Sequence, residues 1–191
     1  MKKVLIDCDP GIDDSLALIL ALKSPQLEVQ ALTAVTGNLP ADRGLKNIHK
    51  ILDLVDEKEI PTARGSLFPL TGDYPQDPFS HGEDGLGNTD LPESKRDPGE
   101  LTAPALITQT ILDTPGELTV LATGPLTNVA QALMQQPEIT TQVKELILIG
   151  GTYGFNRYGL QRATGGNPSS EWNVFVDPEA ARHVFRSDLN I

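Results

Sequence analysis

The chain has 191 residues, of which 39% are hydrophobic and 21% charged, a balance typical of a folded globular protein rather than a disordered or fibrous one. Its formal net charge of −11 disfavours nucleic acid and membranes as partners, because anionic phosphate groups would be repelled. The single cysteine, Cys8, excludes an intrachain disulfide and a cysteine-based metal site. It also fits a cytoplasmic protein, as does an N-terminus without a signal-type apolar stretch.

The first half of the chain alternates between strand-like and helix-like segments. Residues 4–6, 29–35 and 61–65 are short β-favouring runs and predict strands. Residues 16–21 and 41–55 have helix-forming composition or helical spacing of apolar residues and predict helices. Residues 68–99 are rich in Gly, Pro, Asp and Ser and predict a long loop, which inside a compact domain is more often a binding loop than a linker.

The second half repeats this alternation. Residues 101–112 and 126–134 predict helices, and residues 118–122 and 145–149 predict strands. After a Gly-rich stretch at 150–170, residues 172–176 predict a short strand and residues 178–185 a helix that begins with Pro. Strands and helices in this order predict a single α/β domain over residues 1–191, with a Rossmann-like, mostly parallel sheet and right-handed crossovers.

Polar residues follow four of the predicted strands. These stretches are Asp9 to Asp14, Gly37-Asn38, Thr123-Gly124 and Gly150-Gly151. In open parallel sheets, ligands bind outside the carboxyl ends of the strands. We therefore expect the four stretches to meet at one edge of the sheet and to form a site.

The first of these stretches belongs to an acidic segment, Asp7-Cys8-Asp9-Pro10-Gly11-Ile12-Asp13-Asp14. Helix capping explains one or two of its acids, with Asp9 as the N-cap, Pro10 at the first helical position and Asp13 and Asp14 in the first turn. Capping does not explain all of them, because converging carboxylates raise one another's pKa unless a cation is present. A hard cation such as Ca²⁺ or Mg²⁺ prefers carboxylate and carbonyl oxygens and would neutralise the segment.

The same segment resembles the signature of the inosine-uridine preferring nucleoside hydrolases, a Ca²⁺-dependent family that cleaves the N-glycosidic bond of ribonucleosides. Other landmarks follow in the family order across essentially the whole chain. They are Gly37-Asn38, His81-Gly82-Glu83-Asp84-Gly85, Thr123-Gly124-Pro125-Leu126-Thr127-Asn128, Gly150-Gly151, Glu171-Trp172-Asn173 and Asp177-Pro178-Glu179-Ala180-Ala181.

The resemblance implies roles for individual residues. Ca²⁺ would be bound by the carboxylates of Asp9 and Asp14 and by the backbone carbonyl of Thr123. Asp9 would also be the catalytic residue that accepts the proton of the attacking water. Substrate contacts would come from Asp13, Asn38, His81, Asn167, Glu171 and Asn173.

Simpler interpretations stay open for some of these residues. Asn38 could be only a turn residue, since Asn tolerates a left-handed conformation. Glu171 and Asn173 alternate within a strand-like segment and could form a solvated face. Asn167 stands closer to Glu171 than the family spacing usually has, which weakens its assignment.

Members of the family are longer, and their later portion supplies a His-Asp or related element that completes the metal site and protonates the leaving base. Nothing here matches that element, so the resemblance implies the N-terminal part of a nucleoside hydrolase, inactive if truncated. The implied partners are a small ribonucleoside and further copies of the chain in a homo-oligomer. Two other functions stay open: an inactive module that binds Ca²⁺ or ribose, and a Mg²⁺-dependent phosphohydrolase, whose families also begin with an Asp-rich strand end.

Overall fold

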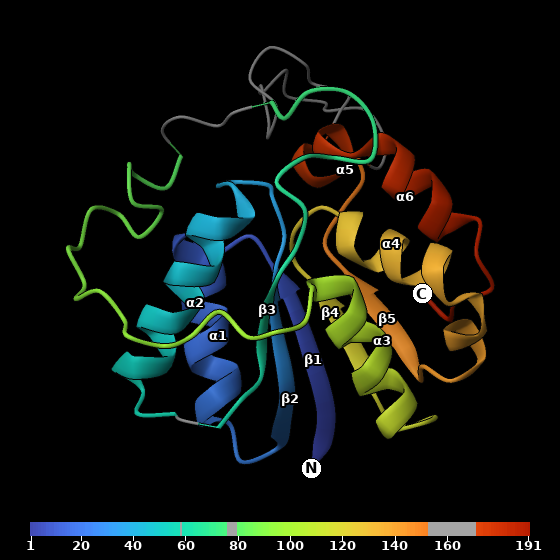
Figure 1. Cartoon of the computed structure of the whole chain (residues 1–191), viewed down its shortest axis with the longest axis horizontal. Helices are drawn as coiled ribbons and strands as arrows, with labels where there is room; N and C mark the ends of the chain where they lie inside the picture. The colour runs from blue at the N-terminus through green and yellow to red at the C-terminus, as the bar shows by residue number, and fades with distance from the viewer. Residues whose placement is uncertain (58, 76–79, 153–170) are drawn as a thin grey trace.

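Figure 1 shows the fold in a computed structural model, which describes residues 1–57, 59–75, 80–152 and 171–191. Its five strands form one sheet in the order β3-β2-β1-β4-β5, and every neighbouring pair is parallel. The strands are β1 (Lys2–Cys8), β2 (Leu27–Ala34), β3 (Thr62–Arg64), β4 (Thr119–Ala122) and β5 (Glu145–Leu148). The predicted Rossmann-like α/β architecture is confirmed.

Helices lie on both faces of the sheet. They are α1 (Ile12–Lys23), α2 (Ala41–Leu54), α3 (Ala103–Asp113), α4 (Thr127–Gln135), a 3-10 turn η1 (Pro137–Thr141), α5 (Trp172–Val176) and α6 (Pro178–Phe185). One face carries α1 and α2, the other carries α3 and α4, and α6 packs on α4 (Figure 1). None of the helices in the described ranges is long and apolar enough to cross a membrane.

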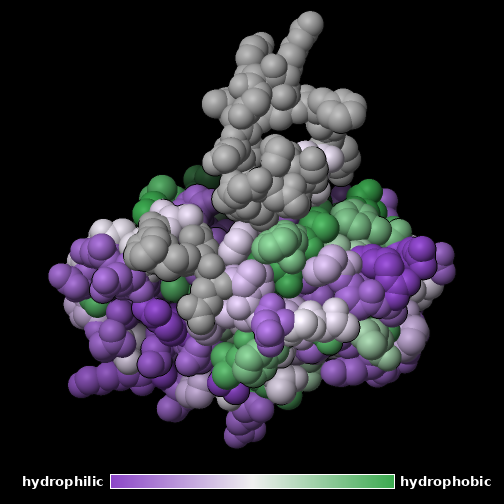
Figure 2. Space-filling view, turned by 90° about the horizontal axis from the view of Figure 1, so that it is seen from above, coloured by the Kyte–Doolittle hydropathy of each residue, from purple (hydrophilic) through white to green (hydrophobic). Residues whose placement is uncertain are grey.

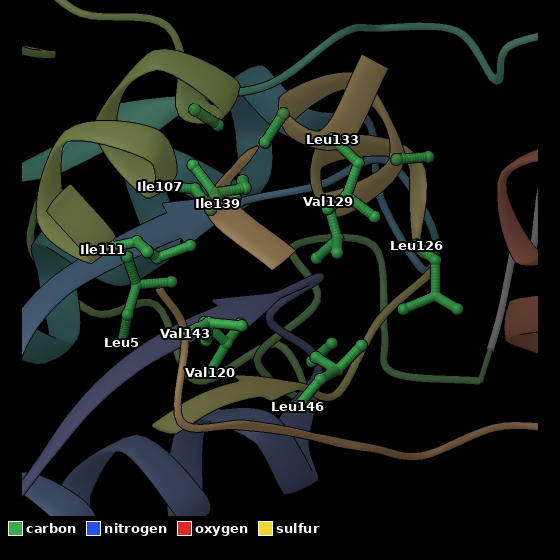
Figure 3. Close-up of a cluster of buried hydrophobic side chains, with 14 of the residues drawn as sticks. Leu5, Ile107, Ile111, Val120, Leu126, Val129, Leu133, Ile139, Val143 and Leu146 are labelled. Carbon is green, nitrogen blue, oxygen red and sulfur yellow. The ribbon is translucent and has the colours of Figure 1, made fainter. Parts of the chain in front are cut away.

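The central strand β1 is packed from both sides. Leu5 points to the α3 and α4 side, into the cluster drawn in Figure 3, whereas Val4 and Ile6 point to the α1 and α2 side. Side chains alternate along a strand, so Asp7 lies on the same face as Leu5. Burying a leucine of this kind contributes about 1.5–3 kcal/mol. The carboxyl end of β1, where the acidic segment begins, is therefore firmly held.

The strand order creates a topological switch point beside β1. From β1 the chain moves to β2 and β3 on one side, and it later returns to place β4 and β5 on the other. In sheets of this kind the crevice at the carboxyl ends of the two strands flanking the switch is the usual ligand site. The strands in question are β1 and β4, which are followed by Asp9 and Thr123.

Two local predictions were wrong. Residues 172–176 are the helix α5 rather than a strand, because the Glu171 side chain accepts hydrogen bonds from the backbone N–H groups of Asn173 and Val174 and so caps a helical turn. Asp9 is not the N-cap of α1, because this helix begins two residues later than expected, at Ile12, with Gly11 at the cap. The prediction that Asp13 and Asp14 lie in its first turn is confirmed.

The surface is mostly hydrophilic but is interrupted by hydrophobic side chains, as Figure 2 shows from above. Leu16 and Leu20 on α1 are exposed, and so are Ile147 on β5 and Ile149 just after it. A parallel sheet is ordinarily covered on both faces. In the described part of the chain, however, Ile147 of β5, on the side of the sheet that carries α1 and α2, is 53% exposed.

Candidate functional site

The Asp9 side chain is held by the loop that follows β2. The backbone N–H of Asn38 donates to Asp9 Oδ2 at 2.7 Å, and Asn38 Nδ2 donates to the Asp9 carbonyl at 3.3 Å. Asp9 itself is only 1% exposed. The structure thus brings together Asp9 and Asn38, as expected for residues at the carboxyl ends of neighbouring parallel strands.

Two glycines allow the chain to approach Asp9 this closely. A Cβ atom added at Gly37 would lie 2.0 Å from Asp9 Oδ2, and one added at Gly124 would lie 2.6 Å from Asp9 Oδ1. Any larger residue at either position would push the carboxylate away. The loops after β2 and β4 therefore enclose both oxygens of Asp9.

Asp14 lies beside Asp9 and is 7% exposed. Burial raises the pKa of Asp9 well above its usual value, and the charge of Asp14 raises it further. Burial likewise raises the pKa of Asp14. The nearby Thr123 hydroxyl lowers that pKa in part, although its geometry is not that of a regular hydrogen bond. Without a cation, the pair therefore favours retaining a proton at a pH where free carboxyls are ionised.

The atoms around this pair suit a hard divalent cation. No Lys or Arg in the described ranges forms an ion pair with Asp9 or Asp14, so those residues leave the charge of the pair without a cationic partner. The Thr123 hydroxyl lies near Asp14, and the Thr123 carbonyl accepts a hydrogen bond from Asn173 Nδ2 at 2.8 Å. Among the described residues, no three His, Cys, Asp or Glu side chains gather into a metal cluster, so two carboxylates are the charged ligands available.

His81 comes from the long loop and contacts the start of α1. Its Nδ1 accepts the backbone N–H of Ile12 at 3.2 Å and lies 3.8 Å from Asp13 Oδ1. A Cβ atom at Gly11 would lie 2.7 Å from the same nitrogen, so this contact requires glycine there. The Asp13 side chain is 81% exposed and that of His81 is 20% exposed, so of these two predicted substrate residues Asp13 is the one open to solvent.

Glu171 and Asn173 do not form the solvated strand face considered from the sequence. Both Glu171 oxygens accept backbone N–H groups, including that of Gly151 at 3.1 Å. Asn173 is buried, and its Nδ2 donates to the carbonyls of Thr123 and Ile149 at 2.8 and 2.9 Å. These two residues tie α5 to the ends of β4 and β5. Asn167 lies outside the described residues.

Other polar residues support the site and were given no role from the sequence. Asn47 on α2 donates from Nδ2 to the carbonyls of Pro10 and Asp84, at 3.3 and 2.9 Å, and so joins the acidic segment to the long loop. Asp177 is fully buried and accepts from the Thr127 hydroxyl at 2.6 Å. The sequence showed Asp177 as the first residue of a family landmark, but it did not show that Asp177 bonds to Thr127, which lies 50 positions earlier.

The metal-free protein should lose stability as the pH rises from about 4 to about 7. Burial raises the pKa of Asp7 to about 7, so in this range the native state keeps a proton that the unfolded state, with an ordinary carboxyl pKa of 3.8, has lost. Asp9 and Asp14 act in the same direction, whereas His49, whose pKa burial lowers, opposes them.

Urea unfolding in the presence of a chelator, measured at each pH for wild type and for Asp7→Asn, isolates the share of Asp7. We expect the wild type to lose more stability than the variant between pH 4 and pH 7. Equal pH slopes for the two proteins would contradict the raised pKa.

Comparison with known proteins decides the family. The model of the inosine-uridine preferring nucleoside hydrolases matches residues 4–191. The chain belongs to this family. The resemblance first noted in the acidic segment and the later landmarks is thereby confirmed over nearly the full length of the sequence.

Relatives of known sequence and structure agree with this assignment. The pyrimidine-specific ribonucleoside hydrolase RihA of Citrobacter koseri is 39% identical over 98% of this chain and 58% of its own length. A plant nucleoside hydrolase, PpNRh1, superposes with a TM-score of 0.89 at 40% identity, over 96% of this chain and 56% of that one. The purine-preferring ribonucleoside hydrolase of Gardnerella vaginalis gives a TM-score of 0.87 at 32% identity, over 97% and 58%. The chain thus spans less than two thirds of the length of these relatives.

Proposed function

We propose that this nucleoside hydrolase chain binds Ca²⁺ and takes part in hydrolysing the N-glycosidic bond of ribonucleosides to free base and ribose. The observation that supports this most is the buried pair Asp9 and Asp14 at the switch point of the sheet, in a chain of this family. Two adjacent buried carboxylates to which the described residues offer no cationic partner are unfavourable unless a cation is bound. Their position at the usual ligand crevice gives the cation a role in the reaction.

The proposed metal ligands are the carboxylates of Asp9 and Asp14 and the carbonyl of Thr123. When bound, Ca²⁺ supplies positive charge that lowers the pKa of a water molecule in the site. Asp9 would accept the proton of a water that attacks the anomeric carbon of the ribose. The bond from the Asn38 N–H to Asp9 Oδ2 fixes the direction in which that carboxylate faces.

The ribose would be recognised by Asp13, Asn38, Asn167, Glu171 and Asn173, and His81 would contact the substrate from the long loop. Carboxylates and amides suit ribose because its hydroxyl groups both donate and accept hydrogen bonds. The negative charge of the site would also stabilise the oxocarbenium-like transition state of glycosidic cleavage. In the structure Glu171 and Asn173 are bonded to the backbone, so we infer that they orient α5 as well as contact ribose.

The competing functions make different demands on the chain. A Mg²⁺-dependent phosphohydrolase is disfavoured because the chain belongs to the nucleoside hydrolases. An inactive module that binds Ca²⁺ or ribose would have the same acidic pair and lack turnover. The relatives described above include both a purine-preferring and a pyrimidine-specific enzyme, so a test needs both kinds of nucleoside.

The test is release of reducing sugar from inosine and from uridine, with Ca²⁺ present, by the wild type and by Asp9→Asn. Turnover in the wild type that falls at least about a hundredfold in the variant supports the hydrolase. Absence of turnover with both nucleosides, together with Ca²⁺ binding, would replace it by the binding module.

Sedimentation of the same sample tests the proposed homo-oligomer, which requires a mass above the 20.6 kDa of one chain.

A further inference from the structure

We infer that Asn128, in the first turn of α4, is a positioning residue for the unit formed by Asp9 and Asn38. Asn128 is fully buried. Its Nδ2 donates to Asp7 Oδ1 at 2.8 Å and to the Ala34 carbonyl at 3.1 Å. One amide group therefore joins the last part of β1 to the last residue of β2. It does so from a helix that follows β4.

The two acceptors lie on the strands that lead into the proposed metal site. Asp7 lies on β1 two residues before Asp9, which directly follows the strand. The Thr33 hydroxyl on β2 donates to the same Asp7 oxygen at 2.6 Å, which gives β1 and β2 a second side-chain connection. Ala34 is followed by the loop that carries Gly37 and Asn38. The position of Asn38 relative to Asp9 thus depends on how these strand ends are joined.

The end of β3 also lies against Asn128, and this contact explains why residue 65 is a glycine. A Cβ atom at Gly65, just after β3, would lie 2.0 Å from Asn128 Oδ1. The Gly65 N–H donates to the Ala34 carbonyl at 2.9 Å, the same oxygen that accepts from Asn128. The ends of β1, β2 and β3 and the start of α4 therefore converge on the Asn128 side chain. This arrangement connects the two sides of the switch point.

Loss of the Asn128 amide would leave the buried Asp7 carboxylate and Ala34 carbonyl with fewer donors. Asp7 would keep the bond from Thr33 and the Ala34 carbonyl the bond from the Gly65 N–H, but each loses one donor in a buried place, so the ends of β1 and β2 would shift to compensate. Such a shift separates the Asn38 N–H from Asp9 Oδ2 and weakens the metal site. Residues that support metal ligands in this indirect way typically change metal affinity about 10-fold to 100-fold. The effect on Ca²⁺ rests on the proposed function, whereas the effect on Asn38 does not.

The test uses Asn128→Leu, which keeps the size of the side chain and removes the donor. Thr33→Val is a second variant, with a smaller expected effect because it removes one donor to Asp7 and leaves the bond from Asn128 to the Ala34 carbonyl in place. The matched control is Thr110→Val on α3, which removes a buried hydroxyl bonded to the Leu106 carbonyl, away from the site. Hydrogen exchange at the Asn38 amide is measured without metal, and Ca²⁺ affinity is measured by calorimetry on folded samples.

We expect the Asn38 amide to exchange at least about tenfold faster in Asn128→Leu than in the control, and Ca²⁺ to bind about 10-fold to 100-fold more weakly. Unchanged exchange at Asn38, or an equal change in Thr110→Val, would overturn the positioning role. If Asn128→Leu does not fold, Thr33→Val is compared with the control instead: faster exchange at Asn38 than in Thr110→Val supports the role of this network, and equal exchange overturns it. A wild type that does not bind Ca²⁺ would count against the proposed function, and the exchange of Asn38 would still decide the role of Asn128.

Discussion

Replacing Asp14 with Asn is expected to stabilise the metal-free protein and to abolish its stabilisation by Ca²⁺. Without metal, Asp14 and Asp9 are buried carboxyls whose pKa values burial raises, and the charge of Asp14 adds to the rise at Asp9. An amide at position 14 removes one of the two charges and the repulsion between them. The same change removes a charged ligand from the proposed site, so Ca²⁺ no longer favours the native state.

Thermal unfolding with chelator and with excess Ca²⁺ measures both parts of this prediction. A ligand at 100 times its dissociation constant stabilises the native state by about 2.7 kcal/mol. For a chain of this size that corresponds to a rise in Tm of about 5–10 °C. We expect this rise in the wild type and none in Asp14→Asn, whose Tm with chelator lies above that of the wild type.

Asp113→Asn is the matched control, because Asp113 is exposed on the last turn of α3, away from the carboxyl ends of the strands. It should keep the wild-type response to Ca²⁺. A Ca²⁺-dependent rise in Tm that persists in Asp14→Asn would show that the cation binds elsewhere.

Replacing Gly37 with Ala is expected to disable the site through a single methyl group. The added Cβ would lie 2.0 Å from Asp9 Oδ2 and 2.6 Å from Pro125 Cδ, so both neighbours would have to move. Overpacking of this kind destabilises a protein by about 1–3 kcal/mol. Because the displaced atom is a proposed metal ligand, we expect Ca²⁺ affinity to fall about 100-fold.

Calorimetric titration with Ca²⁺ measures this loss, and Gly150→Ala is the matched control. A Cβ at Gly150 would meet Leu148 Cδ1 at 3.4 Å, which is an ordinary contact. This control should bind Ca²⁺ like the wild type. Wild-type affinity in Gly37→Ala would mean that Asp9 Oδ2 does not face the cation.

Much of the fold was predictable because its pattern is local. The apolar runs predicted each of the five strands found in the described residues, and the meeting of Asp9 with Asn38 followed from the rule that parallel strands end at one edge. Residues 172–176 were misassigned because the alternation of Glu171 and Asn173 also fits a helix whose N-cap is Glu171. Nothing in the spacing distinguishes a side chain that caps a helix from one that faces solvent.

The supporting contacts were not predictable because they join distant parts of the chain. Asn128 and Asp7 are 121 positions apart, and only the strand order places α4 next to the end of β1. The Gly65 requirement is visible only when the Asn128 side chain is in place. The sequence could name Asn128 as part of a landmark, but not the strand ends that it connects.

Calorimetric titration of the folded wild-type chain with Ca²⁺ at pH 7, repeated with Asp9→Asn, tests the central claim most directly. If Asp9 and Asp14 form the metal site of a nucleoside hydrolase, the wild type binds one Ca²⁺ per chain and the variant binds none at the same concentrations. A folded wild type that takes up no Ca²⁺ at millimolar concentration, or a variant that binds it equally well, would contradict the claim.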